Sequence, residues 1–178
     1  MAQVNRAQSI ADSPAVQAAL AEATAYKEML EREAAAKEAA AAQNAAEEAQ
    51  VGAQIGALVE AAYLIASADG RYTSAESERL VERVAALTEN KFSGDSIAAM
   101  AEQAKERCDA EGLAARASAI AELLPDPELR RATLLVASRV GWLDGGVGQK
   151  EGMALQALAH AFGIATPELH KIMAKAHG

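Results

Sequence analysis

The sequence has 178 residues, a formal net charge of −8 at pH 7 and an isoelectric point near 5.0. An acidic surface repels phosphate backbones, which argues against nucleic acid as a partner. The single cysteine, Cys108, cannot form a disulfide framework, and the amino terminus lacks the basic and apolar regions of a signal peptide. No apolar run approaches the ~18 residues of a membrane span. We therefore expect a soluble, cytoplasmic protein with no direct membrane span.

The composition favours helices throughout the chain. Hydrophobic residues make up 51% of the sequence but aromatic residues only 3%, and alanine, the best helix former, is the most frequent residue. No segment shows the alternation of a strand. The sequence predicts an all-α fold, with a compact bundle of about seven short helices, pseudo-repeated helix-loop-helix units, and a long Ala-rich helix before the bundle.

Residues 1–50 are predicted to form an amino-terminal arm. Ser13 and Pro14 provide a cap and a first helical residue, and no Gly or Pro follows before residue 51. Beyond Leu30 the only apolar residues are alanines, so this stretch resembles a semi-rigid helical spacer. Two interpretations stay open, a solvated arm and a stalk that holds the globular part away from a partner; a homo-oligomer formed through the long helix is one arrangement that this sequence allows.

Residues 51–178 are predicted to form the globular domain. Apolar residues recur there at spacings of three and four, which is typical of amphipathic helices. Arg130 and Arg131, next to Asp126 and Glu128, are interpreted as an ordinary solvated face. The expected helices cover residues 51–68, 73–90, 93–108, 113–124, 126–143, 148–162 and 166–177.

Two turns in this domain share one pattern. SADGRYTSAE (residues 67–76) has Asp69 followed by glycine, with Glu76 seven residues later. WLDGGVGQKE (residues 142–151) repeats this pattern with Asp144 and Glu151, and an apolar residue stands three after the aspartate in both. The recurrence suggests a duplicated helix-loop-helix.

Helix capping explains the first turn but not the second. Gly70 can adopt left-handed φ and end a helix, and Thr73 stands three residues before Glu76, the spacing of a capping box. No Ser or Thr stands three residues before Glu151. A capping box therefore does not account for Glu151, and we look for a reason that both turns share.

Divalent cation binding is one such reason. Asp-Gly-x5-Glu is the second half of an EF-hand loop. Position one of that loop would be Ile65 or Val140, so neither turn is an ordinary EF-hand. If the fold brings the turns together, four carboxylates could share one or two cations, of which Ca²⁺, Mg²⁺, Mn²⁺ and Zn²⁺ are the candidates. The predicted metal ligands are Asp69, Glu76, Asp144 and Glu151.

The segments EAAYLIASADGRYTSAESERLVERVAALT and ATLLVASRVGWLDGGVGQKEGMALQALAHAFGIATPELHKI resemble the two halves of the TerB family of tellurite-resistance proteins. The resemblance covers residues 53–173. It implies an all-α, non-enzymatic domain of the bacterial cytoplasm with clustered acids proposed to bind metal ions, and protein partners from a tellurite or stress-response system. The second turn departs from the family, because Gly146, Gly148 and Lys150 stand where acidic or capping residues are common.

The remaining candidates favour structural roles. The histidines, His160, His170 and His177, have no ligands at zinc spacing. Cys108 is interpreted as a half-buried free thiol, and Trp142 as a packing residue, with a partner contact as the alternative.

Three function classes follow from the sequence. The first is a metal-binding or metal-responsive TerB-like module. The second is a structural adaptor whose long helix binds a partner while the acids only cap helices. The third, weaker class is a metal-dependent hydrolase, for which the turns lack polar substrate-binding residues.

Overall fold

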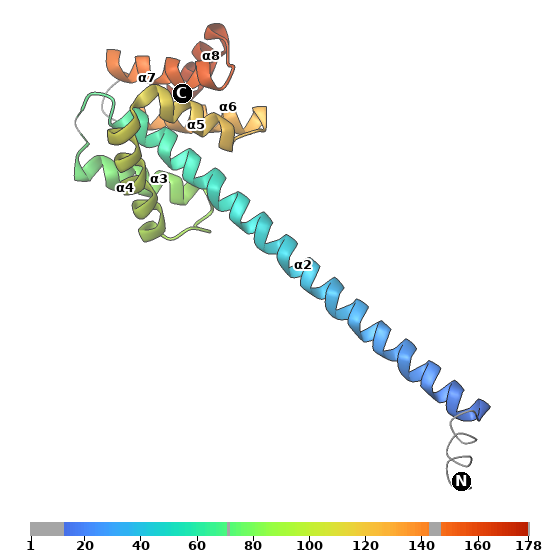
Figure 1. Cartoon of the computed structure of the whole chain (residues 1–178). Coiled ribbons are helices and arrows are strands. Elements are labelled where there is room, and N and C mark those ends of the chain that lie inside the picture. The colour runs from blue at the N-terminus through green and yellow to red at the C-terminus, as the bar shows by residue number, and fades with distance from the viewer. Residues whose placement is uncertain (1–12, 71, 143–146, 178) are drawn as a thin grey trace. The chain divides into compact units, whose positions relative to one another are not determined.

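The computed structural model describes residues 13–70, 72–142 and 147–177, and its regular elements in these ranges are all helices (Figure 1). The predicted all-α fold and the long leading helix are confirmed, and no strand occurs within the described ranges. The helices are α2 (Pro14–Ala66), α3 (Ser74–Leu87), α4 (Gly94–Glu111), α5 (Leu113–Leu123), α6 (Pro127–Gly141), α7 (Gln149–Ala161) and α8 (Thr166–His177).

The arm helix and the first domain helix are one continuous element. We expected a new helix near residue 51, but α2 continues through Gly52 without interruption. A glycine inside a helix costs about 1 kcal/mol relative to alanine, too little to break a helix that is anchored at one end. The chain nevertheless divides into two compact units, Met1–Ala49 and Gln50–Gly178, with the boundary inside α2.

The last turns of α2 form the centre of the second unit. One side of the helix, with Leu64 and Ile65, joins a cluster that includes residues of α5, α6, α7 and α8. Another side, with Val59 and Tyr63, joins a second cluster with residues of α3, α4 and α6. Every residue of α2 from Val59 to Ala66 is buried. Burial on all sides explains why this segment lacks the polar face of an amphipathic helix.

By length and composition, α2 is the one described helix that could cross a membrane. Half of its most apolar window is buried inside the protein. A core helix enclosed by its own domain has the same composition.

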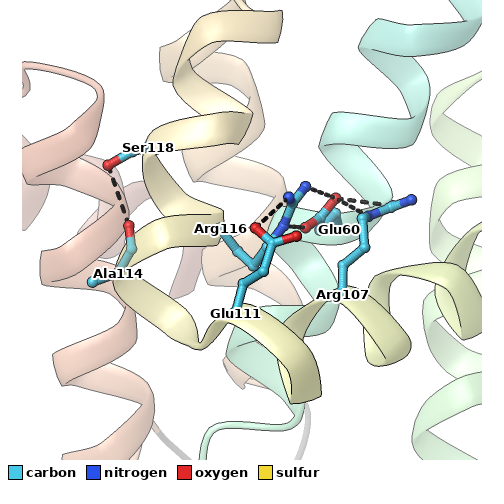
Figure 2. A network of polar contacts seen from close by, with 6 residues as sticks. All are labelled: Glu60, Arg107, Glu111, Ala114, Arg116 and Ser118. Carbon is cyan, nitrogen blue, oxygen red and sulfur yellow. Dashed lines mark hydrogen bonds and ion pairs between the residues drawn. The ribbon is translucent and has the colours of Figure 1, made fainter.

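A buried carboxylate ties α2 to two neighbouring helices. Glu60 is 1% exposed, and Figure 2 shows it between the guanidinium groups of Arg107 on α4 and Arg116 on α5. Arg116 binds it with two parallel hydrogen bonds, Nε to Oε1 at 2.6 Å and Nη2 to Oε2 at 3.1 Å. Arg107 donates from Nε to Oε2 at 3.1 Å, and Arg116 also donates to Glu111 at 3.0 Å.

These contacts compensate the cost of burying charge. The hydrogen bonds to Glu60 raise the pKa of Arg116 well above its ordinary value, so this guanidinium stays charged. A buried ion pair is expensive to break because the remaining partner keeps an uncompensated charge. Glu60 was not among the residues singled out from the sequence.

The predicted solvated face is wrong for Arg130, whereas Arg131 is 41% exposed and pairs with the exposed Glu128, as such a face implies. Arg130 donates to the carbonyl oxygens of Ala121 and Leu124 at the end of α5, and to that of Phe162 after α7. Arg131 donates to Glu168 on α8 at 2.5 Å and to Glu128 at 2.7 Å. Carbonyls at helix ends lack partners within the helix, so a cation there satisfies them and interacts favourably with the dipole.

The Glu60 network gives a first testable prediction. Glu60→Gln removes the charge that compensates Arg116 and Arg107, so we expect the free energy of unfolding to fall by about 3–5 kcal/mol. Urea denaturation followed by circular dichroism measures this loss. Glu111→Gln is the matched control, because Glu111 is 48% exposed and its ion pair should contribute only about 0–1 kcal/mol. Equal losses in the two variants would contradict the central role of Glu60.

Candidate cation site at the paired turns

The first turn leaves α2 through a left-handed glycine. Gly70 has φ +83°, as predicted, and its N–H donates to the carbonyl of Ser67 at 2.9 Å. A residue in this conformation cannot continue a right-handed helix. The next helix, α3, begins after its N-cap, Thr73. Asp69 is exposed.

The predicted capping box at the start of α3 is confirmed. The Thr73 hydroxyl oxygen accepts from the Glu76 N–H at 3.3 Å. Glu76 Oε2 in turn accepts from the Thr73 N–H at 2.6 Å and from the Thr73 hydroxyl at 2.8 Å. Glu76 therefore has a structural role at the amino end of α3, as the spacing indicates.

The second turn contains half of the same cap. Gly148 is the N-cap of α7, and its N–H donates to Glu151 Oε2 at 2.5 Å. Our inference that capping does not account for Glu151 was therefore wrong. The reciprocal half of a capping box needs only the backbone N–H of the N-cap residue, and glycine supplies it as well as threonine does. Only the hydroxyl half is lost.

The apolar residue that recurs in both turns packs against the domain. Tyr72 contacts the ring of Tyr63 edge to face, with ring centroids 4.8 Å apart, and burial raises the pKa of its hydroxyl. Val147 packs against the cluster that contains Leu64 and Ile65. In both copies this residue anchors the turn to the core.

The fold brings the described end of the second turn, at the start of α7, beside the first turn. Lys150, in the first turn of α7, donates from Nζ to the carbonyl oxygen of Asp69 at 3.2 Å. Gly141, at the end of α6, lies so close to α2 that a Cβ there would be 3.0 Å from Ile65 Cγ2. Even an alanine at 141 would require Ile65 to shift by a few tenths of an ångström.

Three of the four predicted ligands lie in the described ranges. These are Asp69, Glu76 and Glu151; Asp144 lies outside the described residues. Within the described ranges, no three His, Cys, Asp or Glu side chains lie close enough to hold a metal ion. Each capping glutamate binds its N-cap residue through Oε2, so Oε1 is the oxygen that it could offer a cation without competing with the cap.

The other candidates occupy structural positions. Cys108 is a half-buried free thiol whose pKa is raised by burial and by the neighbouring charges of Asp109 and Glu60, which makes it a poor nucleophile. Trp142 packs edge to face against His177, with ring centroids 4.4 Å apart. His160 and His170 are exposed.

A second prediction distinguishes the capping role of the two glutamates from the effect of their negative charge on stability. Glu151→Ala and Glu76→Ala should each lower the free energy of unfolding by about 0.5–2 kcal/mol in metal-free buffer, because each leaves an N-cap amide without its acceptor. Glu151→Gln should retain most of that stability, because the amide oxygen still accepts the hydrogen bond. Chemical denaturation measures all three variants. The exposed Glu78→Ala is the control and should change stability by less than about 0.5 kcal/mol; a Glu151→Ala variant as stable as this control would refute the cap.

Comparison with known proteins agrees with this fold. The family model described as Tellurite resistance protein TerB matches residues 55–174, which is about two thirds of the chain and includes both turns. Neither the curated proteins nor the solved structures contain a match to the chain. On the match to its family model, the chain belongs to the TerB family of tellurite-resistance proteins.

Proposed function

We propose that this chain is a non-enzymatic, cytoplasmic TerB module that binds a divalent cation at its paired turns and acts through other proteins in tellurite resistance or a related stress response. The observation that carries the proposal is the contact between Lys150 Nζ and the Asp69 carbonyl, which joins the two turns. Glu76 and Glu151, which are 75 residues apart in the sequence, each stand at the start of a helix that follows one of these turns. Membership of the family supports the link to tellurite resistance.

The available oxygens indicate the class of cation. Carboxylate oxygens are hard ligands that suit Ca²⁺, Mg²⁺ and Mn²⁺ better than Zn²⁺, for which histidine and cysteine are the usual partners. Glu76 Oε2 accepts two hydrogen bonds in its cap and Glu151 Oε2 accepts one, so monodentate binding through Oε1 disturbs the caps least. A cation held this way keeps several water molecules, so the affinity should be modest.

Lys150 limits the affinity of such a site. Its ammonium group lies beside the first turn and opposes an incoming cation. The positive charge of Lys150 also offsets part of the negative charge of the carboxylates, as a bound cation would. The turns can therefore remain together when no cation is bound. This arrangement suits a reversible response better than permanent loading.

The chemistry of the interior supports a non-enzymatic role. Glu60, a buried carboxylate, is held by two guanidinium groups and so is tied to a structural ion pair. Burial raises the pKa of the Cys108 thiol, which opposes formation of the nucleophilic thiolate.

A structural adaptor is the second candidate function. The observation that favours it is the role of Glu76 and Glu151 as caps, since capping alone gives both glutamates a reason to recur. In that case each turn serves to end one helix and start the next, and the long helix binds the partner protein.

A thermal melt of metal-free protein with each of the four cations distinguishes the two functions. A cation that binds only the native state should stabilise it by about 2.7 kcal/mol at a hundredfold excess over the dissociation constant. We expect this shift for Ca²⁺, Mg²⁺ or Mn²⁺, and its loss in the double variant Asp69→Asn/Asp144→Asn. If no cation shifts the melting temperature, the adaptor function replaces the cation-binding one.

Lys150→Met gives a third prediction, in which a substitution tightens cation binding instead of abolishing it. Removal of one positive charge about 4 Å from a divalent cation should tighten binding roughly thirtyfold, because a single and a double charge at that distance repel by about 2 kcal/mol in water. Isothermal titration calorimetry measures the change. Lys171→Met, at an exposed position on α8, is the control for net charge. Equal affinities for these two variants would show that the cation binds away from the paired turns.

A further inference from the structure

The first unit of the chain exposes large apolar side chains on one helix. Leu20, Tyr26, Met29 and Leu30 are between 45% and 60% exposed. In the described part of this unit, residues 13–49, α2 is the one regular element, so no second described element covers these side chains there. A helix of this length gains most of its stability in proteins by packing an apolar face, and the exposed residues provide one.

The apolar residues follow the heptad spacing of a coiled coil. Val16, Ala19, Ala23, Tyr26 and Leu30 are separated by three, four, three and four residues, which places them at positions a, d, a, d and a. Leu20 and Met29 flank this seam at positions e and g. The seam ends after Leu30, because the next d and a positions are Glu33 and Lys37.

The charged residues in this stretch leave the seam apolar. Glu28 falls at the outer position f, while Glu22 falls at g and Lys27 at e of the following heptad. In a parallel, in-register pair of helices, position g of one chain faces the next e position of its partner. Glu22 of each copy then faces Lys27 of the other, which gives two attractive contacts related by symmetry.

We propose that residues 16–30 pair with the same residues of a second copy to form a parallel, in-register coiled coil. The charges favour this orientation, because an antiparallel pair that keeps the seam overlapped sets Glu22 against Met29 and Lys27 against Leu20, and both attractive contacts are lost. Lys27 also lies 3.7 Å from Glu31 of its own helix, but both side chains are more than 60% exposed, and such a pair contributes little. The seam spans about two heptads and contains two alanines, so association is reversible and depends on protein concentration.

This interface is independent of the proposed cation site, since it uses none of the residues of the two turns. In this interface a second copy of the chain covers the exposed apolar face of the arm. In such a pair the TerB domains are present as two copies, which strengthens the binding of any partner that carries two matching sites.

Sedimentation of the full-length protein over a range of concentrations tests the fourth prediction. We expect a monomer–dimer equilibrium that Tyr26→Glu/Leu30→Glu shifts at least tenfold towards the monomer. Ala21→Glu/Ala25→Glu adds the same two charges at the outer positions f and c, and should leave the equilibrium within about twofold of the unchanged protein. Circular dichroism confirms that each variant stays folded. A protein that is monomeric at every concentration, or a dimer that the seam variant does not weaken, overturns the proposal.

Charge exchange and cross-linking test the orientation. Glu22→Lys and Lys27→Glu should each weaken the dimer, and the double variant should restore it, because only the pairing of residue 22 with residue 27 of the other copy returns to opposite charges. In a Cys108→Ser background, Ala19→Cys at position d should form an intermolecular disulfide on oxidation, whereas Ala21→Cys at position f should not. A double charge variant weaker than both single variants, or cross-linking at residue 21 alone, would overturn the parallel register.

Discussion

The buried carboxylate of Glu60 is the interaction on which the rest of this domain depends. It places a negative charge in the middle of the most apolar part of α2, where only the two guanidinium groups from α4 and α5 make it tolerable. The bidentate geometry of Arg116 admits little variation in rotation or translation of α2 against α5. Hydrophobic burial around α2 is non-directional, whereas this ion pair is directional and therefore sets the register of the three helices.

The position of the candidate site follows from that register. Once the end of α2 is held, Gly70 directs the first turn towards α3, and the absence of a side chain at Gly141 lets α6 approach Ile65 closely. Lys150 then reaches the carbonyl of Asp69 from the second turn. The duplicated pattern in the sequence thus corresponds to two turns that are adjacent in space, each anchored by one apolar residue and each followed by a glutamate that caps a helix.

The two capping glutamates show how one residue can satisfy two requirements. A cap needs a hydrogen-bond acceptor, which glutamine also provides, while a cation needs negative charge, which glutamine does not. Stability in metal-free buffer and response to cations are therefore separable properties of the same side chain. The long helix adds a third element, because its early apolar residues belong to a unit of the chain that contains none of the residues of the turns.

The sequence by itself determined the all-α class, most helix boundaries, the left-handed glycine and the capping box at Thr73, because these depend on local propensity and on groups within four residues of one another. It could not reveal most partners of Glu60, Arg130 and Arg131, since hydrogen bonds between residues 6 to 56 positions apart leave no periodic signal. It also misjudged Glu151, because the search for a hydroxyl overlooked a backbone amide that every residue except proline carries. Only the tertiary structure decided that the turns are neighbours: that proximity arises from the close approach of α6 to α2, which depends on packing around Gly141 rather than on either turn.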